Sequence, residues 1–243
     1  PATDYRNWYL GDWATPTGID QQDPASVRLV NNCFVAVCYD TMRKIAAHLG
    51  LNEEMKRFAD NCASLIKRIQ DRCDLPDNAS YATGTQIDLV YPMLAGVTPD
   101  ALKEAVVSTL MQVTADRFKG HLSTGLVGVP VITQWATREG KADFMYQMLK
   151  QHGYPGYLYM IDNGATTTWE HWNGERSHIH NCYNGIGSWF YQALAGILPD
   201  EERPGYQHIF IKPQMVDGLT WMNASKHKPY GNVNVNRTFE PNY

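Results

Sequence analysis

The most constraining feature of this sequence is the helical spacing of apolar residues in its first third. From Ala25 to Leu49 they recur at steps of three and four, and Gly50 follows as a stop signal. The stripe runs through Val27, Val30, Phe34, Val37, Thr41 and Ile45. Residues 52–73 repeat the spacing, with Asn52 as N-cap and glutamates in the first turn. Two long antiparallel helices joined by a short loop are predicted.

The same pairing of helices continues along the chain with weaker patterns. Further helices are predicted at Thr85–Ala95, Pro99–Phe118, Pro130–Arg138 and Lys141–Gln151, and a last stripe runs through Ile186, Phe190, Ala193 and Ile197. About seven helices without intervening strands argue against a doubly wound α/β fold. Helical hairpins arranged in a ring or a stack are the expected architecture of residues 1–203.

After Pro204 the pattern changes from a helical to an alternating period. Three stretches are rich in β-branched and aromatic residues and are separated by turn-forming dipeptides: 206–214, 218–228 and 230–240. Residues 204–243 are therefore predicted to open an antiparallel β-sandwich. The predicted fold class is mainly α, with a partial β-sandwich at the end.

Composition excludes some partners and favours others. A formal net charge of −4 gives no electrostatic reason to bind nucleic acid or an anionic membrane, and no apolar run is long enough for a membrane helix. The aromatic content of 12%, with 7 Trp and 14 Tyr, suits wet, concave binding sites such as those for sugars. Free, mostly buried thiols are expected for the five cysteines, Cys33, Cys38, Cys62, Cys73 and Cys182.

Glu170 is the main candidate for chemistry because it stands between Trp169 and Trp172 in "NGATTTWEHWNGERSHIHNC". Aromatic rings beside a carboxylate provide an apolar wall, which is the environment that tunes a carboxyl group for proton transfer. The alternative is structural: the tryptophans pack in the core, and Glu170 pairs with Arg176 or caps a turn.

Other polar residues in the loops give weaker signals. Asp12, beside Trp13, is equally compatible with binding and with capping a helix or turn. His178 and His180 alternate, but no thiolate or carboxylate cluster completes a metal site, so no metal is expected. His171 is expected to be exposed. Phosphate-binding, dinucleotide-binding and nucleophile-elbow motifs are absent from the sequence, and no cofactor is implied.

A carboxylate with aromatic walls on a ring of helices favours glycoside hydrolysis. In that reaction one carboxylic acid protonates the leaving oxygen, while a second carboxylate activates water or attacks the sugar carbon. The residues alone indicate this class of reaction and do not specify the sugar.

Several stretches in one order resemble the bacterial α-L-rhamnosidase family of glycoside hydrolases. They are "GDWATPTG", "HLSTGLVGVP", "YPGYLYMIDNGATTTWEHWNG", "YNGIGSWFYQALAGI" and the tail from "PGYQHIFIKPQ" to "KPYGNV". The resemblance spans nearly the whole chain, and "GATTTWEHW" is its most specific part. It implies an (α/α)6 barrel followed by a β-sandwich, and cleavage of terminal α-L-rhamnose with inversion of configuration.

The resemblance also implies roles for individual residues. Glu170 corresponds to the general base that deprotonates the attacking water. His180 corresponds to a histidine that contacts the sugar. Asp12 and Trp13 match a loop that provides a hydrogen bond and a ring wall, and Trp169 and Trp172 are expected to stack on the apolar face of rhamnose.

The general acid of the family lies in an acidic segment before "GDW", which this sequence starts too late to contain. The chain is therefore expected to be the C-terminal part of a larger rhamnosidase, nearly inactive alone, with rhamnose-containing glycosides or polysaccharides as substrates. Two alternatives remain open. One is another (α/α)6 glycoside hydrolase or a polysaccharide lyase, although the loops are poor in the Arg and Lys that a lyase needs. The other is a carbohydrate-binding module without catalysis.

Overall fold

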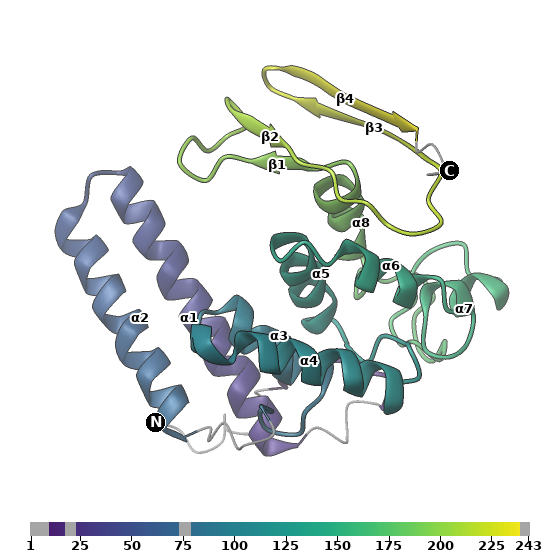
Figure 1. Ribbon diagram of the computed structural model, residues 1–243, viewed down its shortest axis with the longest axis horizontal. Helices are drawn as coiled ribbons and strands as arrows, with labels where there is room; N and C mark the ends of the chain where they lie inside the picture. The colour runs from purple at the N-terminus through teal and green to yellow at the C-terminus, as the bar shows by residue number, and fades with distance from the viewer. Residues whose placement is uncertain (1–9, 18–22, 73–78, 239–243) are drawn as a thin grey trace.

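The computed structural model describes residues 10–17, 23–72 and 79–238 of the 243-residue chain. Helices form its first part and antiparallel strands its last part (Figure 1). The helices are α1 (Pro24–His48), α2 (Asn52–Arg72), α3 (Gln86–Leu94), α4 (Asp100–Asp116), α5 (Gly128–Arg138), α6 (Ala142–Leu149), α7 (Tyr157–Asp162), α8 (Ile186–Trp189) and the π-helical turn η3 (Phe190–Leu194). The strands are β1 (Ile197–Pro199), β2 (Ile209–Ile211), β3 (Trp221–Lys228) and β4 (Gly231–Thr238). The predicted mainly helical class with antiparallel strands at the end is confirmed.

The helices form two layers of hairpins. α1, α3, α5 and α8 contact one another in turn, whereas α2, α4 and α6 each pack on the helix that precedes them. The central position of α3 is reflected in its burial, because residues 86–93 are all buried. The first helix of every hairpin therefore belongs to the inner layer.

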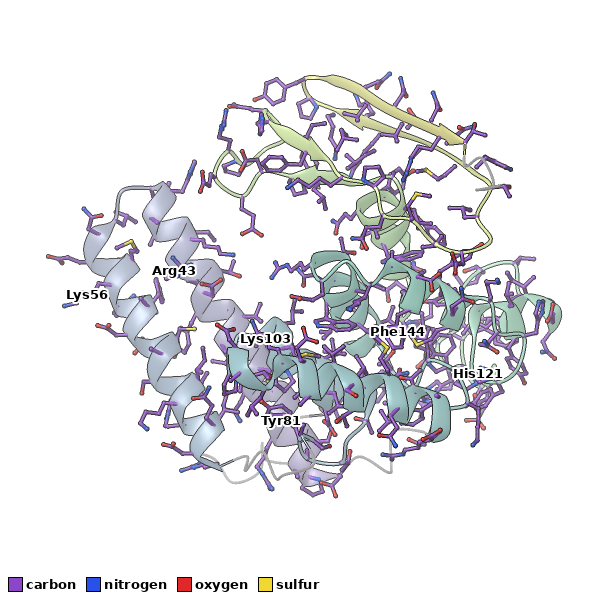
Figure 2. All side chains as sticks on the ribbon, in the orientation of Figure 1. Arg43, Lys56, Tyr81, Lys103, His121 and Phe144 are labelled. Carbon is purple, nitrogen blue, oxygen red and sulfur yellow. The ribbon has the colours of Figure 1, made fainter. Side chains whose placement is uncertain are left out.

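This layering places the loops of different hairpins at one end of the molecule. Each hairpin reverses the chain, so the inner helices run in the same direction and the segments before them meet at their amino ends. Tyr81, before α3, and His121, before α5, both lie in the half of the view away from the strands (Figure 2). Segments 10–14, 79–85, 121–127 and 163–185 are thus brought to the same end.

The buried face of α1 differs from the predicted stripe. Its buried residues are Leu29, Val30, Cys33, Ala36 and Ala46. Phe34 of the predicted stripe is 55% exposed and Ile45 is 46% exposed. The physical reason is that α1 contacts α2 on one side and α3 on another, so small residues are buried at these close contacts. Phe34, Met42 and Ile45 lie on a second face of α1 that stays exposed among the described residues.

Two short elements were not predicted, and one helix ends early. α7 lies in a segment expected to be a loop, and β1 lies where the last helix was expected to continue through Ile197. Instead, η3 ends at Leu194, and Ile197 pairs with Ile211 of β2. Gly196 between them has a φ of 68°, which stops the helix and reverses the chain. The domain division after residue 203 stays a prediction, and β1 lies before it.

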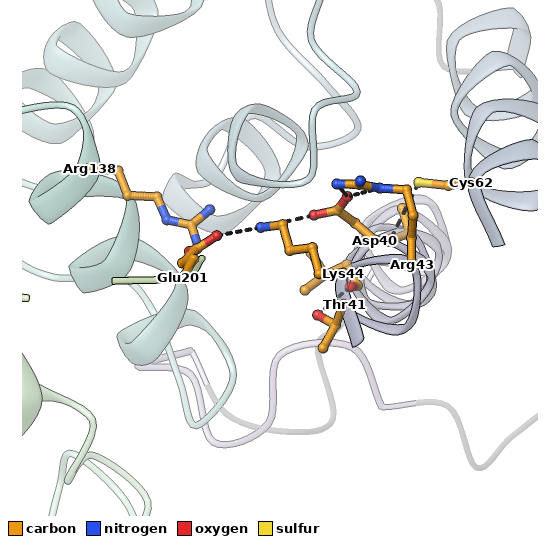
Figure 3. A network of polar contacts seen from close by, with 9 residues as sticks. Asp40, Thr41, Arg43, Lys44, Cys62, Arg138 and Glu201 are labelled. Carbon is orange, nitrogen blue, oxygen red and sulfur yellow. Dashed lines mark hydrogen bonds and ion pairs between the residues drawn. The ribbon is translucent and has the colours of Figure 1, made fainter. Parts of the chain in front are cut away.

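The two strand hairpins pack on each other and on the end of η3. Ala195 and Ile197 form a small core with Val235, against which Met222 and Ala224 also pack. An ionic network ties this region to the helices (Figure 3). Glu201, in the β1–β2 connection, lies 2.7 Å from Lys44 Nζ of α1 and 3.5 Å from the guanidinium of Arg138 in α5. These half-exposed pairs orient the connection and contribute little free energy.

Four of the five cysteines lie among the described residues, and all four are free, as predicted. Cys33 and Cys182 are buried, whereas Cys38 is exposed, so the expectation of burial is wrong at that position. Cys73 lies outside the described residues. Among the described helices, none is both long and apolar enough to cross a membrane.

Candidate active site

The loop between α7 and α8 folds back on itself and carries most of the candidate residues. The backbone N–H of Glu170 donates to the carbonyl of Ser177 at 2.8 Å, and that of His180 donates to the carbonyl of Thr168 at 2.9 Å. Gly174, with a φ of 81°, makes the turn between the two arms. Glu170 and His180 therefore lie on paired arms of one loop.

Glu170 is largely enclosed, and no lysine or arginine among the described residues forms an ion pair with it. Its side chain is 17% exposed, and its Oε2 accepts the backbone N–H of Ser177 at 3.2 Å. Oε1 lies 3.9 Å from Nε2 of His171. Arg176 makes no ion pair with Glu170, so that part of the structural alternative is wrong. Its other parts are met, because Trp169 and Trp172 are buried and Glu170 accepts a backbone N–H of its own loop. Burial and then the charge of Glu170 raise the pKa of the Cys182 thiol to about 11, which keeps this neighbour neutral.

Trp169 is 5% exposed and forms one wall of the loop. The His178 ring stacks on it with centroids 4.8 Å apart. Gly174 lies against the same indole, and a Cβ at this glycine would lie 3.0 Å from Trp169 Cζ3. The ring is thus held by the turn of its own loop, and its stacking on a sugar stays a prediction.

Trp172 is 1% exposed and belongs to the core. It stacks on Tyr183 at 3.9 Å between centroids and meets Tyr157 edge-on at 5.3 Å. Its indole N–H donates to the carbonyl of Thr124 at 2.8 Å. Trp172 therefore anchors the loop to the segment before α5. Neither face of its ring is exposed in the described part of the chain, and its sugar contact stays a prediction.

Asp12 holds the amino end of α5. One carboxylate oxygen accepts the N–H of Gly125 at 2.7 Å, and the other accepts those of Val127 at 3.0 Å and Gly128 at 2.8 Å. Burial raises the pKa of the Asp12 carboxyl to about 6, although the three N–H donors oppose part of this shift. Of the two roles considered for Asp12, the structure shows the capping contact, and the sugar contact stays a prediction.

Trp13 and Ala14 dock the same loop onto both neighbouring segments. The Trp13 carbonyl accepts the N–H of Leu126 at 2.7 Å. Gly125 is required at this contact, because a Cβ there would lie 1.9 Å from the Trp13 oxygen. The Ala14 carbonyl accepts the hydroxyl of Tyr183 at 2.8 Å. Segments 10–14, 124–128 and 169–183 therefore form one connected unit around the half-buried Trp13.

The three histidines of the loop differ in their surroundings. His180 is half-buried, and its Nδ1 accepts the N–H of Cys182 at 3.1 Å. His178 is exposed and donates from Nε2 to the carbonyl of Gly174 at 2.7 Å. His171 was expected to be exposed, and this is wrong: it is 7% exposed, because it shares the buried arm of the loop with two tryptophans. Within the described ranges, no three potential ligands gather to hold a metal ion.

Three residues that shape the site, Ser177, Thr124 and Tyr183, were not predicted from the sequence. Ser177 donates its backbone N–H to Glu170, and a backbone donor leaves no side-chain signal. Thr124 accepts the indole N–H of Trp172 through its backbone carbonyl, which likewise leaves no side-chain signal. Tyr183 could have been found, because "NCYNG" places an aromatic residue between the histidines and the next helix.

A cavity of about 600 Å³ opens at the same end of the molecule. Asp12, Thr85, His121 and Tyr154 are among its lining residues, whereas Glu170 is not. Its buried carboxylate, Asp12, is already held by three N–H donors. Glu170 keeps an oxygen without a hydrogen bond among the described residues, so it is the better candidate for proton transfer.

The two layers of helical hairpins, the following β domain and the enclosed carboxylate are those of a hairpin-built glycosidase domain. The family model described as the bacterial alpha-L-rhamnosidase 6 hairpin glycosidase domain matches residues 2–194, and that of the bacterial alpha-L-rhamnosidase C-terminal domain matches residues 196–241. The chain belongs to the bacterial α-L-rhamnosidase family.

Individual proteins agree with this assignment. The chain is 30% identical to an alpha-L-rhamnosidase of Alteromonas sp. over 94% of its own length and 26% of that protein. It is 29% identical to one of Formosa agariphila over 92% of its length and 25% of that protein. The chain thus spans about a quarter of these relatives.

Solved structures agree on the fold, an (α/α)6 barrel with a β domain after it. The structure of α-L-rhamnosidase from Dictyoglumus thermophilum matches 98% of this chain and 28% of its own, with a TM-score of 0.87 and 26% identity. That of Streptomyces avermitilis α-L-rhamnosidase, complexed with L-rhamnose, matches 99% of this chain and 23% of its own, with a TM-score of 0.84 and 26% identity. The prediction of a partial (α/α)6 barrel with part of a β domain after it is confirmed.

Proposed function

We propose that this chain forms part of an enzyme that hydrolyses terminal α-L-rhamnosyl residues of glycosides, with inversion at the anomeric carbon. The observation that carries the proposal is the environment of Glu170. Its carboxylate is 17% exposed, has one oxygen fixed by the N–H of Ser177, and forms no ion pair with a described lysine or arginine. A fixed carboxylate free of cations can accept a proton from water.

In this mechanism Glu170 is the general base. Oε1 accepts a proton from a water molecule while the water oxygen attacks the anomeric carbon of rhamnose. The bond between that carbon and the glycosidic oxygen breaks, and the leaving oxygen takes a proton from a carboxylic acid on the opposite face. Inverting enzymes hold the two carboxyl groups roughly 6.5–9.5 Å apart. The acid is proposed to come from residues outside this chain.

The other candidate residues are proposed to shape the sugar site. His180 lies on the arm paired with that of Glu170 and is proposed to contact the same ligand. Trp13 is half-buried and is proposed to provide a ring wall of the sugar site. Asp12 and Trp172 are proposed to act by holding these loops, since their polar atoms already have partners. Trp169 is proposed to border the sugar, although it is only 5% exposed.

The test is hydrolysis of p-nitrophenyl α-L-rhamnoside, alongside other p-nitrophenyl glycosides, by the full-length protein that contains this chain. Glu170→Gln is expected to lower kcat by about 10²–10⁴-fold, the usual value of general base catalysis. Glu175→Gln is the matched control, because Glu175 lies in the same loop and is exposed. The first product anomer seen by proton NMR is expected to be β-L-rhamnose.

The outcomes separate the alternatives. Release from another sugar would retain the hydrolase and replace the substrate. Rhamnose binding without hydrolysis, unchanged by Glu170→Gln, would favour a carbohydrate-binding module. An α-anomeric first product would contradict inversion.

A further inference from the structure

His171 has a buried ring nitrogen that makes no hydrogen bond within the described part of the chain. The side chain is 7% exposed, and its Nε2 is inaccessible to solvent and makes no hydrogen bond among the described residues. A buried unsatisfied polar group costs about 1–3 kcal/mol, so such an atom in a folded protein calls for an explanation. The carboxylate of Glu170 is close by, with Oε1 at 3.9 Å from Nε2.

The backbone around this pair is fixed. The N–H of Glu170 donates to the carbonyl of Ser177 at 2.8 Å, and the carbonyl of His171 accepts the N–H of Gly174 at 3.0 Å. With these backbone bonds kept, the distance of 3.9 Å shortens to a hydrogen bond by movement of the two side chains. Contacts of this kind are often long without a ligand and shorten when the substrate complex forms.

We propose that His171 is a positioning residue for Glu170. Its Nε2–H donates to Oε1 of Glu170 when the substrate is bound, while the N–H of Ser177 holds Oε2. Two donors from opposite ends of the carboxylate set the direction of its remaining lone pairs and favour the ionised form that accepts the proton of water. This inference rests on the proposed role of Glu170 as general base.

Other titratable groups near Glu170 are few in the described part of the chain. Cys182 is neutral over the working range, because its pKa is raised to about 11 by burial and by the charge of Glu170. His178 stacks on Trp169 and bonds to a carbonyl, and His180 lies on the paired arm. Asp12, whose pKa burial raises to about 6, belongs to the connected loop and is controlled separately below.

The experiment measures kcat/KM for p-nitrophenyl α-L-rhamnoside against pH in the full-length protein. His171→Leu removes the donor and keeps an apolar side chain in the buried position. His171→Gln places an amide N–H near the position of Nε2. His48→Gln, at the exposed end of α1, is the matched control. Asp12→Asn reports the contribution of that carboxyl to the profile.

For His171→Leu we expect kcat to fall by about tenfold, KM to change by less than about twofold, and the acid limb of the profile to move to higher pH. His171→Gln is expected to restore the wild-type limb. The wild-type limb is expected to persist in His48→Gln.

A loss of activity that is equal at all pH values, with a lower melting temperature and no movement of the limb, would overturn the inference and leave His171 a packing residue. If His171→Leu does not fold, His171→Gln and His171→Asn decide, since only the former places a donor near Nε2. If Glu170→Gln remains active, the proposed function itself fails. If Glu170→Gln is inactive while the limb stays fixed in the His171 variants, only this inference fails.

Discussion

The hydroxyl of Tyr183 donates to the carbonyl oxygen of Ala14 at 2.8 Å, across 169 residues of sequence. The same tyrosine ring stacks on Trp172, which lies two residues after Glu170. Through this side chain the loop before α1 is joined to the loop that carries the proposed base. The position of Glu170 therefore depends on a contact made near the opposite end of the described chain.

Tyr183→Phe tests this link. The substitution keeps the ring on Trp172 and removes the hydroxyl, leaving a buried carbonyl without its donor. We expect the free energy of unfolding to fall by about 1–2 kcal/mol. Urea denaturation measures it, with Tyr191→Phe at an exposed tyrosine as the control. Equal stability of Tyr183→Phe and the wild type would show that the hydrogen bond does not hold the two loops together.

The Asp12 carboxyl predicts a dependence of stability on pH. Burial raises its pKa from 3.8 to about 6, so between these values the folded protein binds more protons than the unfolded protein. Stability from this group is fully present below about pH 4 and is lost as pH rises through about 6, by up to about 3 kcal/mol.

The free energy of unfolding of the wild type and of Asp12→Asn is measured by urea denaturation between pH 4 and pH 7. The difference between the two proteins isolates the contribution of Asp12, because the other titrating groups contribute equally to both. The asparagine is neutral throughout and imitates the protonated acid. We expect the wild type to lose stability relative to Asp12→Asn as pH rises. A gain instead would mean that the three N–H donors outweigh burial, and that the carboxyl ionises more readily in the fold than in water.

Gly125→Ala is expected to disrupt the junction between the loop before α1 and the start of α5. The new Cβ would lie 1.9 Å from the Trp13 carbonyl oxygen and 2.8 Å from its carbon, so backbone must move. A loss of about 3 kcal/mol or more is expected in urea denaturation, at the upper end of single substitutions.

Gly187→Ala is the matched control for that substitution. Nothing lies within 4 Å of a Cβ at Gly187, and the residue is in α8. Alanine is favoured over glycine inside a helix, so the control is expected to be neutral or slightly more stable. Similar losses in both variants would indicate a general intolerance of glycine substitution rather than a clash at Gly125.

The long helices could be predicted because their apolar period extends over several turns, as in residues 52–72. α7 and β1 could not, since six and three residues are too short to establish a period. Phe34 shows a different difficulty: the period identifies apolar faces of α1 but not the face that meets α2 and α3.

At the site, the candidate base could be selected from its tryptophan neighbours, whereas its partners could not. The N–H of Ser177 and the three N–H groups around Asp12 are backbone donors, and any residue type supplies them. His171 is buried because the loop folds back on itself at Gly174. The local pattern of residue types does not reveal this fold.

The common direction of α1, α3, α5 and α8 has a consequence for the history of such a site. The segments before these helices belong to different hairpins. An insertion in one of these loops therefore leaves the spacing of the helices intact. The loops can thus change in sequence one at a time while the packing of the helices stays the same. The shape of the site and the stability of the fold can therefore vary separately. Asp12 and Tyr183 contribute to both, because each joins one loop to another.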